Sequence, residues 1–159
     1  MGKSMKFLSI LLVLSLFVLS ACVKGGNNNS SCGGSFTESE PNSTVGTAND
    51  FGITFTPGCS ITISGNILSG EIDGFDINTG NASNLTFTLT WSSGNDGADI
   101  GYLNSAGTII GAFATATVDL ETGTVNVTAA QNANRIVTVD ATAVGANNAG
   151  AYTLTITAN

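Results

Sequence analysis

The sequence predicts an all-β domain, built as a β-sandwich or barrel of about eight or nine short strands. Three observations support this: apolar and polar residues alternate, turn-forming residues recur at short intervals, and no sustained helical periodicity with caps follows residue 22. The alternation is clearest after Asn84, in the run Leu-Thr-Phe-Thr-Leu-Thr-Trp. Its apolar residues share one face, and its threonines share the other. The apolar residues are Leu85, Phe87, Leu89 and Trp91.

The N-terminus has the features of a lipoprotein signal peptide. Lys3 and Lys6 precede an apolar run from Phe7 to Leu19, which is shorter than the roughly 20 residues that a spanning helix needs. The end of this run, Leu19-Ser20-Ala21-Cys22, resembles the lipobox of bacterial lipoproteins. The resemblance implies cleavage after residue 21 and lipid on Cys22. The alternative is ordinary secretory cleavage that leaves a free Cys22.

A lipidated Cys22 would hold the protein on a membrane, outside the cytoplasm, because two or more acyl chains anchor a protein stably. Val23 stands where an inner-membrane retention signal would have Asp, so in a host with two membranes we expect the outer membrane. Residues 22–35 are mostly Gly, Asn and Ser and are predicted to form a flexible tether. It would place the domain, residues 36–159, roughly 20 Å from the bilayer.

The predicted strands follow one another closely along residues 36–159. Turn residues such as Ser105-Ala106-Gly107 and Glu121-Thr122-Gly123 separate them. The expected strands are Ile61–Ile67, Ile72–Ile77, Leu85–Trp91, Ile100–Leu103, Thr108–Phe113, Thr115–Leu120, Thr124–Thr128, Ile136–Ala141 and Tyr152–Ile156.

The charge and the cysteine content limit the classes of partner that the protein could bind and the compartment in which it could fold. Without residues 1–21, the chain has two basic residues, Lys24 and Arg135, and eleven acidic ones, a net charge of −9. Two cations cannot neutralise a phosphate backbone, so nucleic-acid binding is excluded. With Cys22 lipidated, Cys32 and Cys59 remain as an even pair in an oxidising compartment, which predicts a disulfide between them.

Four short motifs, in order, resemble the bacterial pre-peptidase C-terminal (PPC) domain family. They are Glu38-Ser39-Glu40-Pro41-Asn42, Gly70-Glu71-Ile72-Asp73-Gly74-Phe75, Asp99-Ile100-Gly101-Tyr102-Leu103 with Gly107, and Gly150-Ala151-Tyr152-Thr153-Leu154. The resemblance implies a single jelly-roll-like β-sandwich that serves as a binding or stabilising module. Such modules are usually appended to secreted peptidases, whereas we expect this one to stand without a peptidase.

The composition argues against an enzyme. The chain has no His, which excludes Ser-His and Cys-His nucleophile pairs and His-ligated zinc. Paired carboxylates could support acid/base chemistry, and Glu71 with Asp73 or Asp96 with Asp99 are candidate pairs. Local pairs in Gly- and Asn-rich segments are usually solvated turn formers, however. We therefore expect no catalytic residues.

One oxygen-rich constellation could bind calcium. Glu38, Glu40 and Asn42 alternate, so an extended segment would aim all three in one direction. The PPC resemblance implies that Glu71 and Asp73 lie nearby and complete a calcium site, since Ca²⁺ takes six to eight hard oxygen ligands. Ser43 stands where the family has a further Asp. The alternative is a solvated acidic edge without a metal.

Two functions stay open at this point. The first is a non-catalytic envelope lipoprotein whose sandwich contacts another envelope protein or a cell-surface polymer. The second is a ligand-binding module with a surface site for sugar or peptide, stabilised by calcium if that ion binds. Sugar sites often need exposed aromatic side chains, yet Trp91 falls on the apolar face of its strand, which favours a core or rim position.

Overall fold

A computed structural model of the chain describes residues 32–91, 98–113, 120–141 and 150–159. The predicted signal peptide, Cys22 and most of the predicted tether lie outside these residues. No helix in the described ranges is long and apolar enough to cross a bilayer. The described elements are ten strands and one short 3₁₀ helix: β1 (Gly34–Thr37), β2 (Asn49–Thr54), β3 (Ser60–Ile67), β4 (Ile72–Asn78), β5 (Asn84–Trp91), β6 (Asp99–Asn104), β7 (Ile109–Phe113), β8 (Leu120–Asn126), η1 (Thr128–Ala130), β9 (Asn134–Asp140) and β10 (Gly150–Ala158).

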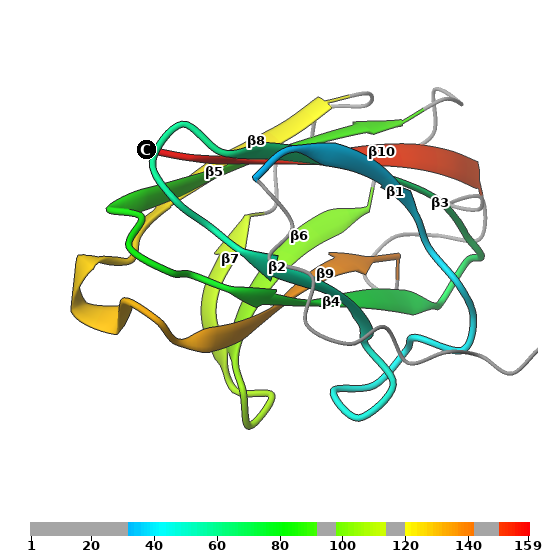
Figure 1. Ribbon diagram of the computed structural model, residues 1–159. Helices are drawn as coiled ribbons and strands as arrows, with labels where there is room; N and C mark the ends of the chain where they lie inside the picture. The colour runs from blue at the N-terminus through cyan, green and yellow to red at the C-terminus, as the bar shows by residue number, and fades with distance from the viewer. Residues whose placement is uncertain (1–31, 92–97, 114–119, 142–149) are drawn as a thin grey trace, which may run out of the picture.

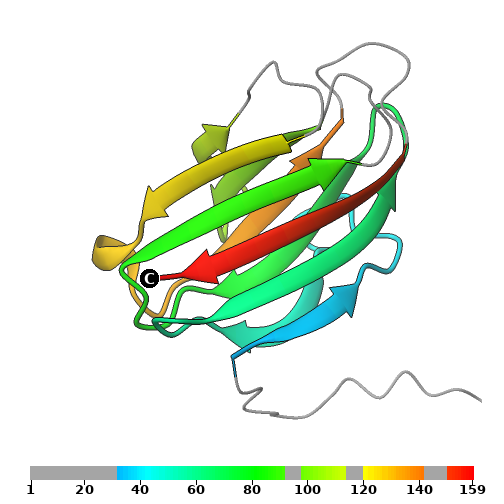
Figure 2. The ribbon, with the colours of Figure 1, turned by 90° about the horizontal axis from the view of Figure 1, so that it is seen from above.

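The strands form two five-stranded sheets packed face to face, seen edge-on as two layers in Figure 1. Sheet A has the order β1-β3-β10-β5-β8 and sheet B the order β2-β4-β9-β6-β7. Figure 2, looking down on sheet A, shows β10 at its centre between β3 and β5. The pairs β1/β3 and β2/β4 are parallel and the others antiparallel. The predicted all-β sandwich is confirmed.

The core forms between the sheets from the alternating residues of each strand. On β5, Leu85, Phe87 and Leu89 are buried while the threonines between them face outward, as the alternation predicts. Their register partners on β10 are apolar too: Leu89 lies opposite Leu154, and Phe87 opposite Ile156. Cross-strand apolar pairs of this kind stabilise the sheet and fix its register.

Two predictions about strands were wrong. No strand was expected at β1 or β2, and β1 begins at Gly34, inside the predicted tether. The segment Glu121-Thr122-Gly123, predicted as a turn, belongs to the continuous strand β8. Gly123 is needed here for close packing, since a Cβ at this position would overlap the Phe113 ring. The predicted strand Thr115–Leu120 lies outside the described residues except for Leu120, the first residue of β8.

The predicted disulfide between Cys32 and Cys59 is present. The two Cα atoms are 5.1 Å apart and 27 positions separate the residues in sequence. Cys59 is buried in the core, and Cys32 packs against it from the start of the described chain. The bond therefore fixes the chain just before β1, an edge strand of only four residues.

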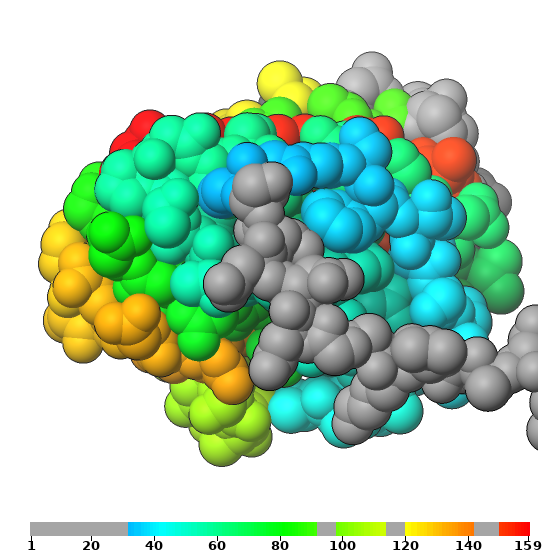
Figure 3. Space-filling view, in the orientation of Figure 1, coloured from blue at the N-terminus to red at the C-terminus, as the bar shows by residue number. Residues whose placement is uncertain are grey.

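The chain crosses from one sheet to the other between β1 and β2. This crossing segment, residues 38–48, runs along the edge of the sandwich, from the upper to the lower layer, in cyan tones in Figures 1 and 3. Backbone hydrogen bonds at residues 38 and 42 fix the first part of the segment to both sheets. The Glu38 N–H donates to the Ser64 carbonyl on β3 at 3.1 Å, and the Asn42 carbonyl accepts from the Gly74 N–H on β4 at 3.0 Å. The segment therefore presents its side chains where the two sheets meet.

Candidate functional site

An acidic cluster forms where the crossing segment meets β4. One carboxylate oxygen from each of Glu38, Glu40 and Asp73 lies within 4.8 Å of the others. Asn42 belongs to the same cluster, since its Nδ2 lies 3.5 Å from Glu38 Oε2 and its N–H donates to Glu40 Oε2 at 3.1 Å. We call Glu38, Glu40, Asn42 and Asp73 the acidic cluster.

Glu71, the fifth residue of the predicted calcium site, does not join this cluster. Its Oε2 accepts a hydrogen bond from the Leu68 N–H at 3.0 Å. Glu71 precedes β4, whose first residue is Ile72, so it lies outside the strand ladder that fixes the direction of Asp73. Glu71 instead lines a neighbouring cavity of about 400 Å³ together with Glu40 and Asp73.

Asp73 is a buried residue of the sandwich, with 1% of its surface exposed. The expectation that Glu71 and Asp73 are both solvated turn formers was therefore wrong for Asp73. It lies opposite Val139 on β9, whose side chain is in the core. The signal was present in the sequence: Asp73 has the same alternation phase as the apolar residues Phe75 and Ile77.

Tyr152 completes the cluster, and sequence analysis did not assign it to the site. Its hydroxyl contacts Glu38 Oε2 and lies 2.8 Å from Asp73 Oδ2. Tyr152 can reach across because its register partner on β3 is Gly65, where a Cβ would overlap the phenol ring. A phenol has one proton to donate, so it cannot satisfy two ionised carboxylates at once.

The surroundings of the cluster oppose its negative charge. Burial, a hydrogen bond with Glu38 and the charges of Glu38 and Glu40 together raise the pKa of Asp73 to about 8. Burial, together with the hydrogen bonds and charges of Glu38 and Asp73, raises the pKa of Tyr152 above its ordinary value. The described residues offer no compensating cation beside the cluster, because Arg135 is their only basic residue and lies opposite Ile77, four positions along β4 from Asp73.

Two acceptor atoms of the cluster are buried without any hydrogen-bond partner. They are Asn42 Oδ1 and Asp73 Oδ1, in residues with 0% and 1% of their surface exposed. Buried acceptors normally have a partner, and an orphan costs roughly 1–3 kcal/mol. Carboxylate and amide oxygens are hard ligands that suit Ca²⁺. The residues present therefore fit a bound calcium ion.

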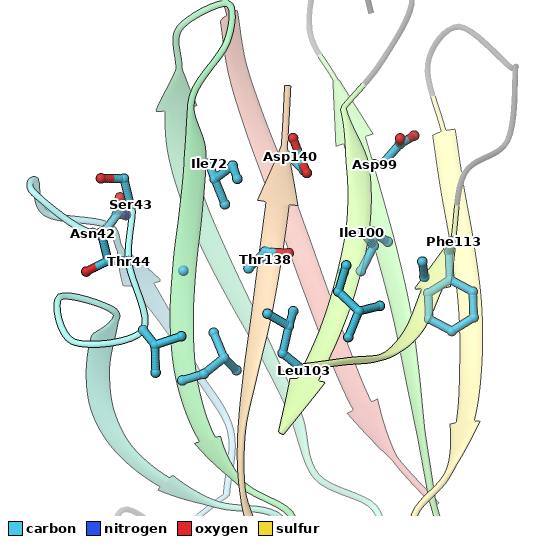
Figure 4. A pocket seen from close by; sticks show the side chains of 16 residues that line it. Asn42, Ser43, Thr44, Ile72, Asp99, Ile100, Leu103, Phe113, Thr138 and Asp140 are labelled. Carbon is cyan, nitrogen blue, oxygen red and sulfur yellow. The ribbon is translucent and has the colours of Figure 1, made fainter. Parts of the chain in front are cut away.

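A second feature, an apolar groove, lies on the outer face of sheet B (Figure 4). Its volume is about 380 Å³. The crossing-segment residues Asn42 to Val45 line one side, and β6 and β7 line the other, as far as Phe113. Strands β4, β9 and β6 form the floor. We call this feature the sheet-B groove.

The outer face of sheet A is very different. It carries hydroxyl side chains, including Thr86 and Thr88 on β5 and Thr155 and Thr157 on β10. Several bond across strands, such as Thr86 Oγ1 with Thr124 Oγ1 at 3.1 Å and Ser60 Oγ with Thr157 Oγ1 at 3.0 Å. This is the polar outer face that a half-solvated sheet normally has. Sheet B departs from that pattern at its groove.

Among the residues that the structure places, aromatic side chains form no exposed surface platform, and Phe113, which lines the sheet-B groove, is half-buried. All aromatic residues after position 31 lie in the described part of the chain, and none is among its exposed large hydrophobic side chains. Trp91 is 8% exposed and stacks on Tyr152 with ring centroids 6.2 Å apart. The predicted core or rim position of Trp91 is confirmed.

Glu121 is a second buried acid that sequence analysis placed in a turn. It is 5% exposed, and its Oε1 accepts a hydrogen bond from the Ile100 N–H at 3.2 Å. The bond joins β8 of sheet A to β6 of sheet B. Burial raises the pKa of Glu121 to about 7. Glu121 thus ties the two sheets together.

Comparison with known proteins gives limited similarity. No protein-family model matches the sequence, and no curated protein is similar to it. Among solved structures, the chain is similar to a pre-peptidase C-terminal domain of a Bacillus anthracis collagenase, with 16% identity, a TM-score of 0.49, and coverage of 69% of this chain and 95% of that one. It is also similar to PliG of Aeromonas hydrophila, a periplasmic inhibitor of g-type lysozyme (9% identity, TM-score 0.42, coverage 80% and 100%).

A third similar structure is the module CsCBM6-3 of Clostridium stercorarium, solved with cellobiose (18% identity, TM-score 0.34, coverage 58% and 70%). At these identities and TM-scores, the three structures do not assign a family or a ligand. The fold is established by the chain's own strand pairing. Membership of the PPC family stays a prediction from the sequence motifs.

Proposed function

We propose that the protein is a non-catalytic envelope lipoprotein whose β-sandwich is an interaction module displayed outside the cytoplasm. The observation that carries this proposal is the contrast between the two outer faces. Sheet A presents hydroxyl ladders, and sheet B presents an apolar groove. Exposed apolar surface of this kind marks a contact site on many soluble proteins.

A polypeptide is a better partner for this groove than a sugar. Sugar sites in β-sandwiches depend on exposed aromatic rings, and Trp91, Tyr102 and Tyr152 are all buried. The groove is lined by aliphatic side chains such as Ile72, Leu103 and Ile109. Such surfaces suit the side chains of another protein. A cell-surface polymer is therefore the second candidate partner.

Membrane attachment through Cys22 would place this face near other envelope proteins. The tether would give the domain freedom to turn the groove towards a partner, since Gly- and Ser-rich linkers behave as flexible coils. In a host with two membranes the outer membrane is the proposed location. The Cys32–Cys59 disulfide supports an oxidising compartment.

Calcium is proposed as a structural ion at the acidic cluster, held by Glu38, Glu40, Asn42 and Asp73. The orphaned oxygens of Asn42 and Asp73 support this proposal. The ion would neutralise carboxylates that otherwise repel one another. Asn42 also lines the groove, so an ion here would fix the wall formed by the crossing segment as well as the junction with the tether.

Site-specific photo-crosslinking in the native host tests the interaction role. A photoreactive residue would replace Ala112, which is exposed in the groove, or Thr122, which is exposed on sheet A as a matched control. We expect one saturable crosslinked product from position 112 in the envelope and none from position 122. Equal products at the two positions, or none at either, would show that the groove is not the contact surface.

A further inference from the structure

We propose that the sheet-B groove binds an extended segment of a partner protein, in which a lysine or arginine is flanked by small and aliphatic residues. The cationic group would lie beside Asp99 and Asp140, and the flanking residues would lie in the groove. This inference deepens the proposed interaction role and rests on it. It names the chemistry of the partner.

A row of small residues forms the floor of the groove. Gly74, Thr138, Gly101 and Ala112 lie opposite one another on β4, β9, β6 and β7. The row is closed to larger side chains at Gly101, where a Cβ would overlap Thr138 Oγ1. A glycine at such a position allows another backbone to approach the sheet closely. The floor is therefore shaped for a main chain.

Aliphatic side chains border the row towards one end of the groove. Ile136 faces outward yet is only 4% exposed, and it is not part of the core cluster. Its register partner on β6 is Leu103, which is paired in turn with Ile109 on β7. Ile109 is 65% exposed and Val45, across the groove, is 42% exposed. The exposed side chains of Ile109 and Val45 would gain burial from apolar residues of a partner.

Two carboxylates border the row towards the other end (Figure 4). Asp99 and Asp140 are directly paired in the antiparallel register of β6 and β9. Like charges in directly opposite positions destabilise a sheet. Burial and, to a smaller extent, the charge of Asp140 raise the pKa of Asp99. A cation placed at this end would relieve the repulsion between the two carboxylates.

The chain's own described residues do not supply that cation. Arg135 is their only basic residue, and its register partners are Ile77 and Asn104, whereas those of Asp140 are Ile72 and Asp99. Residues 135 and 140 differ by an odd number, so they face opposite sides of β9. The whole chain is also strongly acidic, with a net charge of −7. Charge complementarity therefore points to a basic partner.

The size of the groove fits a short extended segment. A volume of about 380 Å³ is at the lower end of the range for binding pockets. In an extended chain, alternate side chains point the same way and lie about 6.6 Å apart. A basic residue could then reach the carboxylate end while an aliphatic neighbour contacts the Ile136 end.

NMR titration of the full chain in detergent micelles tests this inference. The probe is the capped peptide Ala-Val-Gly-Lys-Gly-Val-Ala, in which both valines point to the same side as the lysine, and two control peptides replace its lysine by norleucine or by glutamate. We expect saturable shifts at the amides of Gly74, Gly101 and Thr138 with the lysine peptide. The norleucine peptide should bind at least several-fold more weakly, and the glutamate peptide more weakly still. Added salt should weaken only the lysine peptide.

Matched variants locate the site. Ala112→Phe fills the groove and should abolish the shifts, while Thr122→Phe, on sheet A, should leave them unchanged. The double variant Asp99→Asn with Asp140→Asn should lower the affinity for the lysine peptide to that of the norleucine peptide. Asp50→Asn, which does not line the groove, should not change it. All four variants need to keep the dispersed spectrum of the parent chain.

Several results would overturn the inference. These are equal binding of the lysine and norleucine peptides, absence of binding by all three, and shifts confined to the outer edge of β7. If Lys24→Ala changes the groove resonances, the occupant is the chain's own tether, and a partner segment is excluded. Failure here together with crosslinking from position 112 would overturn only the cationic chemistry. Failure of both experiments would overturn the interaction role as well.

Discussion

Removing the disulfide should destabilise the domain by an amount that follows from the length of the loop it closes. Cys32 and Cys59 are 27 positions apart. In the chain-entropy model, a loop of this length contributes about 3.5 kcal/mol at 25 °C. The entropy of unfolding is about 2.1 cal/mol/K per residue, so the melting temperature of a domain of this size should fall by about 13 °C in the double variant Cys32→Ala, Cys59→Ala.

Without the disulfide, the domain should lose structure locally, at β1, before it unfolds as a whole. Strand β1 has four residues and only one neighbouring strand, so the disulfide is a large part of what holds it. Amides of β1 should lose hydrogen-exchange protection first, while those of central β10 keep theirs until global unfolding. The carbonyl of Ser64, which accepts from Glu38, should then lose its partner, and the acidic cluster should open.

Thermal melting and amide exchange measure these effects, and reduction provides the control. A reductant should lower the melting temperature of the parent chain to that of the double variant and leave the variant unchanged. A decrease below about 3 °C, or equal loss of protection in β1 and β10, would show that β1 is held by its strand pairing and packing instead.

Three further perturbations have defined outcomes. Calcium at about a hundred times its dissociation constant should raise the melting temperature by about 10 °C, and Glu40→Ala should remove the increase. If calcium raises the melting temperature no more than magnesium does, the cluster is a solvated acidic edge without a metal. Without calcium, the domain should melt at a higher temperature at pH 5 than at pH 8, and Asp73→Asn should flatten this dependence; a parallel dependence in the variant would refute the assignment to Asp73. Tyr152→Phe, measured in chelator, should cost about 1–3 kcal/mol of stability by leaving Glu38 and Asp73 without the phenol, and a loss below about 0.5 kcal/mol would contradict that role.

The sign of the pH effect follows from the raised pKa values of the buried acids. Folding raises the pKa of Asp73 from 3.8 to about 8 and that of Glu121 from 4.5 to about 7. The stabilisation that each acid contributes is fully present below its pKa in the unfolded chain. It declines as the pH rises and is lost once the pH passes the pKa of that acid in the folded chain. The slope is at most about 1.4 kcal/mol per pH unit for each group. Bound calcium should reduce the part of the pH dependence of stability that is due to Asp73, because the ion favours the ionised carboxylate.

The strand pattern was readable from the sequence wherever alternation was strict. Strand β5 has apolar residues at every second position, and its buried face was predicted residue by residue. Strands β1 and β2 were missed because they lie at sheet edges, where few positions are buried and the alternation is weak. In β8, a Thr-Gly pair has the composition of a turn, and only the Phe113 ring packed over Gly123 explains its place in a strand.

The candidate site was only partly readable. Alternation of Glu38, Glu40 and Asn42 predicted a shared direction, and the structure brings all three to Asp73. The hydrogen bond between Glu71 and Leu68 could not be predicted, since it depends on the local turn before β4. Tyr152 is 114 positions from Glu38, and their contact follows from the β3/β10 register. The sheet-B groove likewise arises from residues of four strands and the crossing segment.

Membrane attachment through Cys22 underlies the proposed function, because the location, the oxidised cysteines and the display of the groove all depend on it. Mass spectrometry of the protein extracted from its native membrane tests this attachment. We expect a chain that begins at Cys22, lacks residues 1–21 and carries the added mass of two or three acyl chains on that residue. An intact N-terminus, or a soluble secreted chain with an unmodified Cys22, would contradict it.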